Sequence, residues 1–420
     1  MNDFPRVYKI KQKFERKTIA DLHEEVRSAV DAALEEADLP DGARIAVTAG
    51  SRGISNYVQI LQDVVRSLKS KGYSPFLVAA MGSHGRGEAD GQRELLASLG
   101  ITEESMAVDI SCSSKCAQVG ETDEASGRLP VYAASEMLDA DATLLVNRVK
   151  PHTAFRGPYE SGLLKMAAVG LGRPKGATMV HSLGAERMAE VIPAIAKVAF
   201  AKTNIIGGLA IVENAYDETA VVQGIPVGRI FEVEKQLQTE AKKMMPSLPV
   251  DHIDLCLVGE MGKNFSGTGM DTNIIGRMRI QGIPEPEKPA ITYLGVLNLS
   301  EASHGNANGI GLADLTTESL VRDIDYKATY LNSLTSGFLI RAAVPMTFPN
   351  DWELIQGAVK GLKLSNPRTM RLVYMRNTLH LDEIWVSESV FDEIKHLSNV
   401  TVESGPDPIS FDKRGRIRFE

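Results

Sequence analysis

Three histidines lie in glycine-rich segments with polar neighbours, where an imidazole can do chemistry. His84 follows Gly82 and Ser83, whereas His152 and His181 belong to the glycine-rich stretch 147–182. An imidazole can take or give a proton near neutral pH, and it can also bind a metal ion. We interpret these three as candidate catalytic or metal-binding residues, although a lone histidine more often makes a structural hydrogen bond. The structural interpretation is kept for His23, His252, His380 and His396, which lie in ordinary helix, strand or surface sequence.

Lys165 is the other candidate in this stretch, because it interrupts the apolar run Gly-Leu-Leu-Lys-Met-Ala-Ala-Val. A lysine there either extends its amine to solvent or holds a desolvated amine that can act as a nucleophile or an anchor. The many glycines around it break regular helix and let a ligand approach backbone N–H groups closely. The stretch therefore predicts a cationic site for an anionic ligand.

The elements predicted before this stretch form a parallel β-α-β unit. Buried strands are expected at 44–48 (RIAVT) and 76–80 (FLVAA), and the spacing of apolar residues within 57–70 predicts a helix between them. A further buried strand is expected at 142–146 (ATLLV). Strand, helix and strand in this order are typical of a parallel sheet covered by helices.

Arg52, His84 and His152 each follow one of these strands. Ligands of parallel α/β sheets bind at the carboxyl ends of the strands, so the three side chains are expected to meet at one sheet edge. Together with Lys165 and His181, they would line one site.

The same alternation continues through the rest of the chain, with a Pro-containing loop at 245–249 as the expected domain boundary. We predict an α/β protein of two domains, with mainly parallel sheets flanked by helices and the active site in the interdomain cleft. Residues 1–249 would carry the cofactor and the catalytic histidines, and residues 250–420 would contribute substrate contacts. The remaining expected helices are 19–36, 189–201, 230–243 and one near 315–323, and the remaining strands are 205–212, 253–258, 291–296 and 370–374.

Composition excludes several classes of protein. With 43% apolar residues, 24% charged residues and a net charge of -8, the chain can form a sizeable core and has no clustered basic run for nucleic acid. The N-terminal residues lack the apolar core of a secretory signal, and no apolar stretch reaches the ~18 residues of a membrane helix. We expect a cytoplasmic protein that binds neither nucleic acid nor membrane.

Cysteine usage and the missing motifs narrow the chemistry further. Cys112 and Cys116 have the spacing C-x3-C, but no second pair follows, so we expect reduced thiols and no iron–sulfur cluster. The sequence contains no phosphate-binding G-x-x-x-x-G-K-[ST] loop, no G-x-S-x-G nucleophile elbow and no H-E-x-x-H zinc motif. The segment Gly170-Leu171-Gly172 lacks the third glycine of a dinucleotide fingerprint.

Three blocks of this sequence together resemble the nickel-pincer lactate racemase family. Ala49-Gly50-Ser51-Arg52 is similar to the family's D-x-T-R segment, and Gly82-Ser83-His84-Gly85 is similar to its G-T-H-R segment. His152, Lys165 and His181 resemble its His, Lys, His block. The interval of 32 residues from Arg52 to His84 and that of 16 from Lys165 to His181 also fit the family.

The resemblance implies a role for each of these residues. Lys165 would hold the nickel-pincer nucleotide (pyridinium-3,5-bisthiocarboxylic acid mononucleotide), and His181 would be the protein ligand to nickel. Arg52, with Ser51 beside it, would bind the cofactor phosphate or a nearby anion. His84 and His152 would be the acid/base pair, one for each face of the substrate carbon.

The implied function is a racemase or epimerase of a 2-hydroxy acid. The C2–H bond is not acidic, so the reaction removes hydride, which the cofactor accepts, while a histidine takes the hydroxyl proton. The family binds the substrate carboxylate through a Gln and a Lys. In this chain the corresponding region is near the segment GTGMDTNIIGR, where Arg277 or Arg279 could replace that Lys.

Several departures from the family pattern leave other functions open. Ala49 stands where the family has Asp, the stretch from His152 to Lys165 is about three residues longer, and no Pro-Gly follows Lys165. The alternatives are another enzyme on the same scaffold, such as a hydro-lyase or a dehydrogenase, and a non-catalytic metal or nucleotide carrier.

Overall fold

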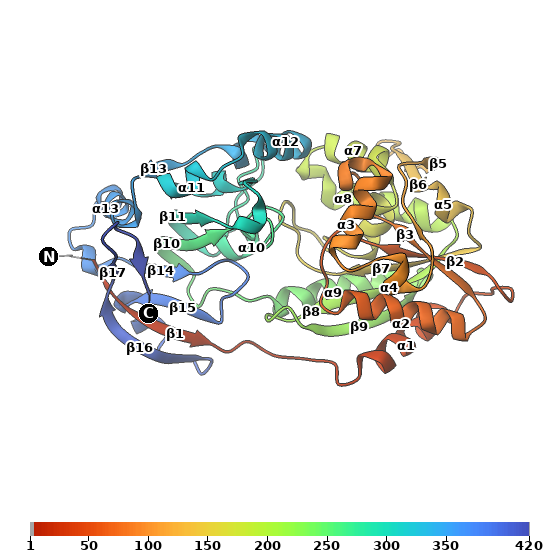
Figure 1. Ribbon diagram of the computed structural model, residues 1–420, viewed down its shortest axis with the longest axis horizontal. Coiled ribbons are helices and arrows are strands. Elements are labelled where there is room, and N and C mark those ends of the chain that lie inside the picture. Colours follow the sequence, from red (N-terminus) through yellow and green to blue (C-terminus); the bar gives the residue numbers. More distant parts are fainter. Residues whose placement is uncertain (1–3, 420) are drawn as a thin grey trace. The chain divides into compact units, whose positions relative to one another are not determined.

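The computed structural model describes residues 4–419 and divides the chain into two compact α/β units (Figure 1). One unit runs from Glu15 to Met245, and the other combines the segment up to Phe14 with everything from Pro246 onward. The division falls in the loop expected as the domain boundary. The N-terminal segment, however, belongs to the C-terminal unit, so a split into 1–249 and 250–420 does not describe the chain.

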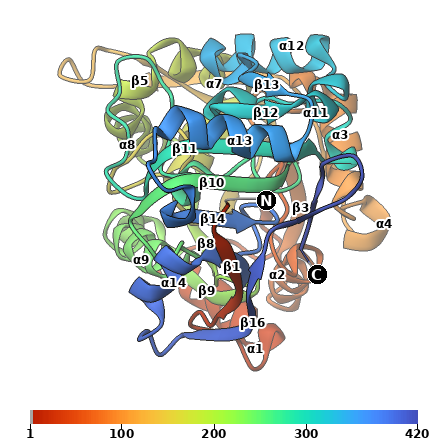
Figure 2. The ribbon, with the colours of Figure 1, turned by 90° about the vertical axis from the view of Figure 1, so that its left-hand side faces the viewer.

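Strand β1 (Arg6–Gln12) explains why the N-terminal segment changes unit. It pairs antiparallel with β15 (Glu383–Ser387) on one side and with β16 (Val400–Pro408) on the other. Figure 2 shows this red strand among the blue strands of the C-terminal segment. Val7 and Ile10 point into the core. Such pairing across the whole length of the chain leaves no local signal in the sequence.

The 15–245 unit is built on a six-stranded sheet in the order β4-β3-β2-β7-β8-β9. All neighbouring pairs are parallel except β8 and β9. The strands are β2 (Arg44–Ala49), β3 (Ser74–Ala79), β4 (Ile110–Ser111), β7 (Ala142–Arg148), β8 (Ile205–Glu213) and β9 (Thr219–Pro226), with a separate hairpin of β5 (Cys116–Glu121) and β6 (Pro130–Ala134). The predicted parallel sheet is therefore present.

Helices cover both faces of this sheet. Successive strand residues alternate between the two layers: Ala46 and Leu145 pack with one set of helices, whereas Val47 and Leu144 pack with the other. Each fully buried valine or leucine side chain in these layers stabilises the fold by ~1.5–3 kcal/mol. One layer contains α1 (Leu22–Ala33), α2 (Tyr57–Ser70) and α3 (Ala89–Ser98), and the other contains α6 (Leu163–Lys165), the π-helical turn η2 (Met166–Gly170), α7 (Arg173–Ser182), α8 (Ala185–Lys202) and α9 (Ile230–Met244). The short helices η1 (Gly85–Gly87), α4 (Glu103–Met106), α5 (Ser135–Leu138) and η3 (Val227–Arg229) lie in the connections.

The other unit has an eight-stranded sheet in the order β13-β12-β11-β10-β14-β15-β1-β16. Its half from β13 to β14 is parallel, and the rest is antiparallel. The further strands are β10 (His252–Met261), β11 (Ala290–Leu299), β12 (Leu315–Thr317), β13 (Met346–Phe348) and β14 (Leu372–Met375), with a hairpin of β17 (Ser410–Phe411) and β18 (Ile417–Arg418). Its helices are α10 (Thr272–Ile275), α11 (Glu318–Arg322), α12 (Tyr326–Ser336), α13 (Asp351–Leu362) and α14 (Glu388–Ile394), with short turns η4 (Glu301–Ser303), η5 (Ile310–Leu312), η6 (Leu339–Ala342) and η7 (Pro367–Thr369).

The helix predicted near 315–323 is partly wrong, because its first residues form β12. This strand pairs with β11, and the helix α11 begins only at Glu318, where the Thr317 hydroxyl caps it by accepting from Leu320 N. Among residues 4–419, no helix is both long enough and apolar enough to cross a membrane.

Candidate functional site

The loops that follow β2 and β3 bring Ser51 and His84 together. The Ser51 Oγ lies 2.5 Å from His84 Nδ1, a hydrogen-bond distance, and the His84 side chain is exposed. Gly50 N donates to the buried Tyr57 hydroxyl at 2.7 Å, which fixes the start of the same loop. Because Nδ1 faces Ser51, Nε2 lies on the opposite side of the imidazole. The Ser51 hydroxyl thus orients the ring of His84.

His152 lies in the loop after β7, and its hydrogen bonds define which ring nitrogen carries a proton. Its Nδ1 accepts a hydrogen bond from Ala154 N at 3.1 Å, so the neutral imidazole carries its hydrogen on Nε2. The ring also packs against Phe155, with 4.4 Å between the centroids. In this state His152 donates through Nε2 and would have to break the Ala154 bond before Nε2 could accept a proton.

Lys165 ends the single turn α6, directly before the π-helical turn η2. Such turns often mark functional sites. Its side chain is half-buried, and within residues 4–419 its amine makes no hydrogen bond or ion pair. Burial, together with the charges of Arg52 and Lys150, lowers the pKa of Lys165 to about 7. A large fraction of the amine is therefore neutral and nucleophilic at physiological pH.

Arg52 and Lys150 complete a cationic cluster around this amine. Arg52 keeps access to solvent, yet protein atoms desolvate its guanidinium, and this effect together with the charge of Arg148 lowers its pKa. Arg148 itself pairs with the buried carboxylate of Glu213. A site in which cations lower each other's pKa is suited to an anion such as a phosphate. Lys150 was not among the predicted residues, although it lies two residues before His152.

His181 was expected in a loop, but it lies in the last turn of helix α7. The glycines thought to break helix here serve close packing instead: a Cβ at Gly172 would lie 2.7 Å from the Ala168 carbonyl oxygen. The His181 side chain is exposed, and desolvation together with the charge of Lys165 lowers its pKa. A neutral imidazole is the form that binds a metal ion. In the described part of the chain, no group of three or more His, Cys, Asp or Glu residues could hold a metal.

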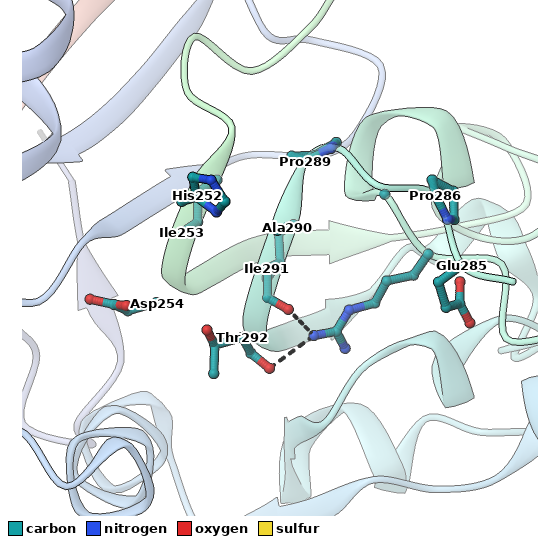
Figure 3. A pocket seen from close by; sticks show the side chains of 11 residues that line it. His252, Ile253, Asp254, Glu285, Pro286, Pro289, Ala290, Ile291 and Thr292 are labelled. Carbon is teal, nitrogen blue, oxygen red and sulfur yellow. Dashed lines mark hydrogen bonds between the residues drawn. The ribbon is translucent and has the colours of Figure 1, made fainter.

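Arg277 and Arg279 are in the other unit, and their guanidinium groups are already bound. Arg277 pairs with Asp314 at 2.5 Å. It also donates to the carbonyls of Ile291 and Thr292, and these two hydrogen bonds are the dashed lines of Figure 3. Arg279 pairs with the same carboxylate. The groups line or adjoin a shallow pocket of about 410 Å³ at the amino-terminal ends of β10 and β11, the end opposite to the usual ligand site. Both guanidinium groups therefore have structural partners, and the substrate-carboxylate role of these arginines stays a prediction.

Cys112, Cys116 and Cys256 are free thiols, as the cysteine count predicted. Burial raises the pKa of each thiol, and it raises that of Cys256 to about 12. Thiols with raised pKa values are weak nucleophiles at neutral pH, so the candidate chemistry stays with the histidines and Lys165.

Two buried carboxylates of the site were missed by sequence reasoning. Glu160 accepts from His152 N at 2.7 Å, and Glu234 accepts from Leu163 N at 2.5 Å. The available signal is in helix α9, where Glu234 and Gln238 occupy positions on the apolar face set by Ile230, Val233 and Leu237.

Comparisons with known proteins give a fold relationship. No family model and no curated protein matches the sequence. Among solved structures, the chain is similar to the structure of the lactate racemase apoprotein from Thermoanaerobacterium thermosaccharolyticum, with a TM-score of 0.50 and 10% sequence identity. The match covers 88% of this chain and 94% of that chain. At this identity the likeness shows a shared fold over most of both chains.

Proposed function

We propose that this chain is a racemase or epimerase of a 2-hydroxy acid that uses a nickel-pincer nucleotide. The observation that carries the proposal is the desolvated, unpaired amine of Lys165 in a cluster of cations next to the loop of Ser51 and His84. Two further points support it. The fold is similar to that of a lactate racemase apoprotein, and the three sequence blocks resemble that family in their order and in the intervals from Arg52 to His84 and from Lys165 to His181.

The residues present fit a cofactor of this kind. Lys165 would anchor it through the amine, and Arg52 and Lys150 would bind its phosphate, since both are cations whose charges act on the Lys165 amine. His181 would supply one imidazole to the metal from the end of α7. When bound, the cofactor supplies a reversible hydride acceptor.

The chain's own residues would handle the substrate protons. His84, oriented by Ser51, would accept the hydroxyl proton at Nε2. His152 would donate from Nε2 to the oxygen on the other face as an imidazolium, a form in which Nδ1 is also protonated and no longer accepts from Ala154 N. If the 2-keto acid turns over between the two imidazoles, its C2 carbon could receive the hydrogen on either face, which gives either enantiomer. We leave the residue that binds the substrate carboxylate unassigned.

The test is a racemisation screen of 2-hydroxy acids with protein from a host that makes the cofactor. We expect bound nickel and interconversion of at least one substrate from each enantiomer. The variant His181→Ala should lose nickel, whereas His396→Ala, an exposed histidine of the other unit, should keep it. Bound nickel without turnover of any 2-hydroxy acid would favour the carrier or hydro-lyase alternatives. Equal nickel in both variants would remove His181 from the ligand role.

A further inference from the structure

One face of helix α9 contacts both segments that carry the proposed catalytic groups. Glu234, Gln238 and Lys242 lie four residues apart, so they line the same side of the helix. Glu234 and Gln238 are each 1% exposed. Burying a carboxyl and an amide costs free energy unless they make hydrogen bonds, so their placement needs an explanation.

Glu234 holds the turn that carries Lys165. Its Oε2 accepts from Leu163 N at 2.5 Å and from Leu164 N at 3.2 Å. These N–H groups are in the first turn of α6, where a helix has no acceptor of its own. A Cβ at Gly162 would lie 2.5 Å from the Glu234 carboxyl, although φ of Gly162 is 171° and allows any residue. Glycine is thus required at 162 to make room for this carboxyl.

Glu160 does the same for the loop that carries His152. Its Oε2 accepts from His152 N at 2.7 Å, and its Oε1 accepts from Gly157 N at 3.1 Å. Two residues of α9 hold it in turn: Lys242 Nζ lies 2.6 Å from Oε1, and Gln238 Oε1 accepts from Glu160 N at 3.3 Å. Glu160 is 1% exposed, so this carboxylate is a buried link between loop and helix.

Burying these polar side chains of α9 costs free energy, because two of their atoms lack a hydrogen-bond partner among the described residues. Glu234 Oε1 and Gln238 Nε2 are buried and have no hydrogen-bond partner within residues 4–419. Burial also raises the pKa of Glu234 to about 8. An apolar residue would avoid both penalties but would leave the N–H groups of Leu163 and Leu164 without their acceptor.

We propose that Glu234 and Glu160 are positioning residues that fix Lys165 and His152, respectively, with helix α9 as their common support. The proposal rests on the proposed function for what Lys165 and His152 do, but their placement can be measured without cofactor or substrate.

The first test follows the amine of Lys165 in the full chain. Purified parent, Glu234→Ala, Glu234→Gln and the exposed control Glu232→Ala are treated with trinitrobenzenesulfonate at pH 7.5, and each lysine is followed by peptide mass spectrometry. We expect Lys165 to react about tenfold more slowly in Glu234→Ala, because a displaced amine returns to solvent and is protonated. The Gln variant keeps an acceptor oxygen and should react like the parent and the control.

Gly162→Ala disturbs the same contact from the side of the α6 turn. It replaces Glu234→Ala in the test if that variant does not fold. Its methyl group would displace the Glu234 carboxyl and should slow the modification of Lys165 to a similar extent. Parental reactivity of Lys165 in Glu234→Ala or Gly162→Ala, with only a lower melting temperature, would overturn the positioning role of Glu234. So would a Gln variant as slow as the Ala variant.

The second test follows His152 by the ¹⁵N chemical shifts of its ring in protein labelled at histidine. Parent protein should show Nδ1 as the unprotonated nitrogen, whereas Glu160→Ala should show a mixture of tautomers because the loop is released. Glu160→Gln keeps an acceptor and should restore most of the parental signal. An unchanged tautomer in Glu160→Ala would overturn the role of Glu160. A protein that passes both tests but racemises no hydroxy acid would contradict the proposed function alone.

Discussion

The two units treat their cationic side chains in opposite ways. In the C-terminal unit, Arg277 and Arg279 share the carboxylate of Asp314 and also donate to backbone carbonyls. In the 15–245 unit, no carboxylate among residues 4–419 pairs with Lys165, and burial, together with the charges of Arg52 and Lys150, lowers its pKa to about 7. A carboxylate partner offsets the charge of a cation, whereas cations that lie close together repel each other, and a bound anion relieves that repulsion. This difference supports the proposal that the ligand site lies in the 15–245 unit.

The largest effect is expected at the histidines of that unit. His84→Ala and His152→Ala should each lower turnover by ~10²–10⁴-fold from both enantiomers, because every inversion needs one proton acceptor and one donor. Both residues lie in loops, so the melting temperature should change little. The measurement is turnover from each enantiomer separately with cofactor-loaded protein. Near-parental turnover of His152→Ala in both directions would remove it from the mechanism.

Substitution of Arg277 should mainly lower stability, whereas substitution of Arg52 should mainly weaken nucleotide binding. Arg277→Ala breaks an ion pair that is mostly buried and frees several carbonyls, so it should lower the free energy of unfolding by about 2–3 kcal/mol. Arg52→Ala should change it by less than about 0.5 kcal/mol but weaken binding of nicotinic acid mononucleotide. Urea denaturation and calorimetric titration measure the two effects. If Arg277→Ala weakens binding of the nucleotide and Arg52→Ala does not, the assigned roles of the two arginines are wrong.

Lys165→Met should stabilise the protein without cofactor. Folding lowers the pKa of this amine from 10.5 to about 7, so the charged form opposes folding. The penalty is complete below pH 7, falls as pH rises and vanishes above about pH 10.5. We expect a gain of about 2 kcal/mol at pH 6, reduced because the side chain is only half-buried, and almost none at pH 10.5. Urea denaturation at the two pH values checks this; a gain that does not depend on pH would indicate a packing effect.

Ser51→Ala should have the smallest effect, about tenfold on turnover, because it removes one orienting hydrogen bond from His84 and leaves the imidazole in place. Ser51→Thr retains the hydroxyl and should recover most of the loss. Steady-state kinetics of the three proteins measure it. A Ser51→Ala variant with nucleotide affinity reduced and turnover unchanged would return Ser51 to the cofactor-binding role that the sequence suggests.

Local patterns in the sequence predicted helices and strands, but they could not predict pairing between strands that are far apart in the sequence. The apolar spacing of Val58, Leu61, Val64 and Leu68 predicted helix 57–70, and α2 has those bounds. By contrast, β1 pairs with strands from the far end of the chain, so no local signal assigns it to a sheet.

The candidate site divides in the same manner. His84, Lys165 and His181 could be picked out from residue type and neighbours, whereas Glu160 and Glu234 act through backbone N–H groups that the sequence does not reveal. The substrate-binding role expected of Arg277 and Arg279 came from their place near the family's Lys, which says nothing of the Asp314 carboxylate that binds them.

The most direct test of the central claim is the pH dependence of amine modification for every lysine of the chain without cofactor. The account predicts that Lys165 reaches half of its maximal rate near pH 7, whereas exposed lysines do so near pH 10, and that nicotinic acid mononucleotide protects Lys165 selectively. Lys165 titrating with the exposed lysines, or equal protection of all lysines, would contradict a ligand site built around a desolvated Lys165 amine.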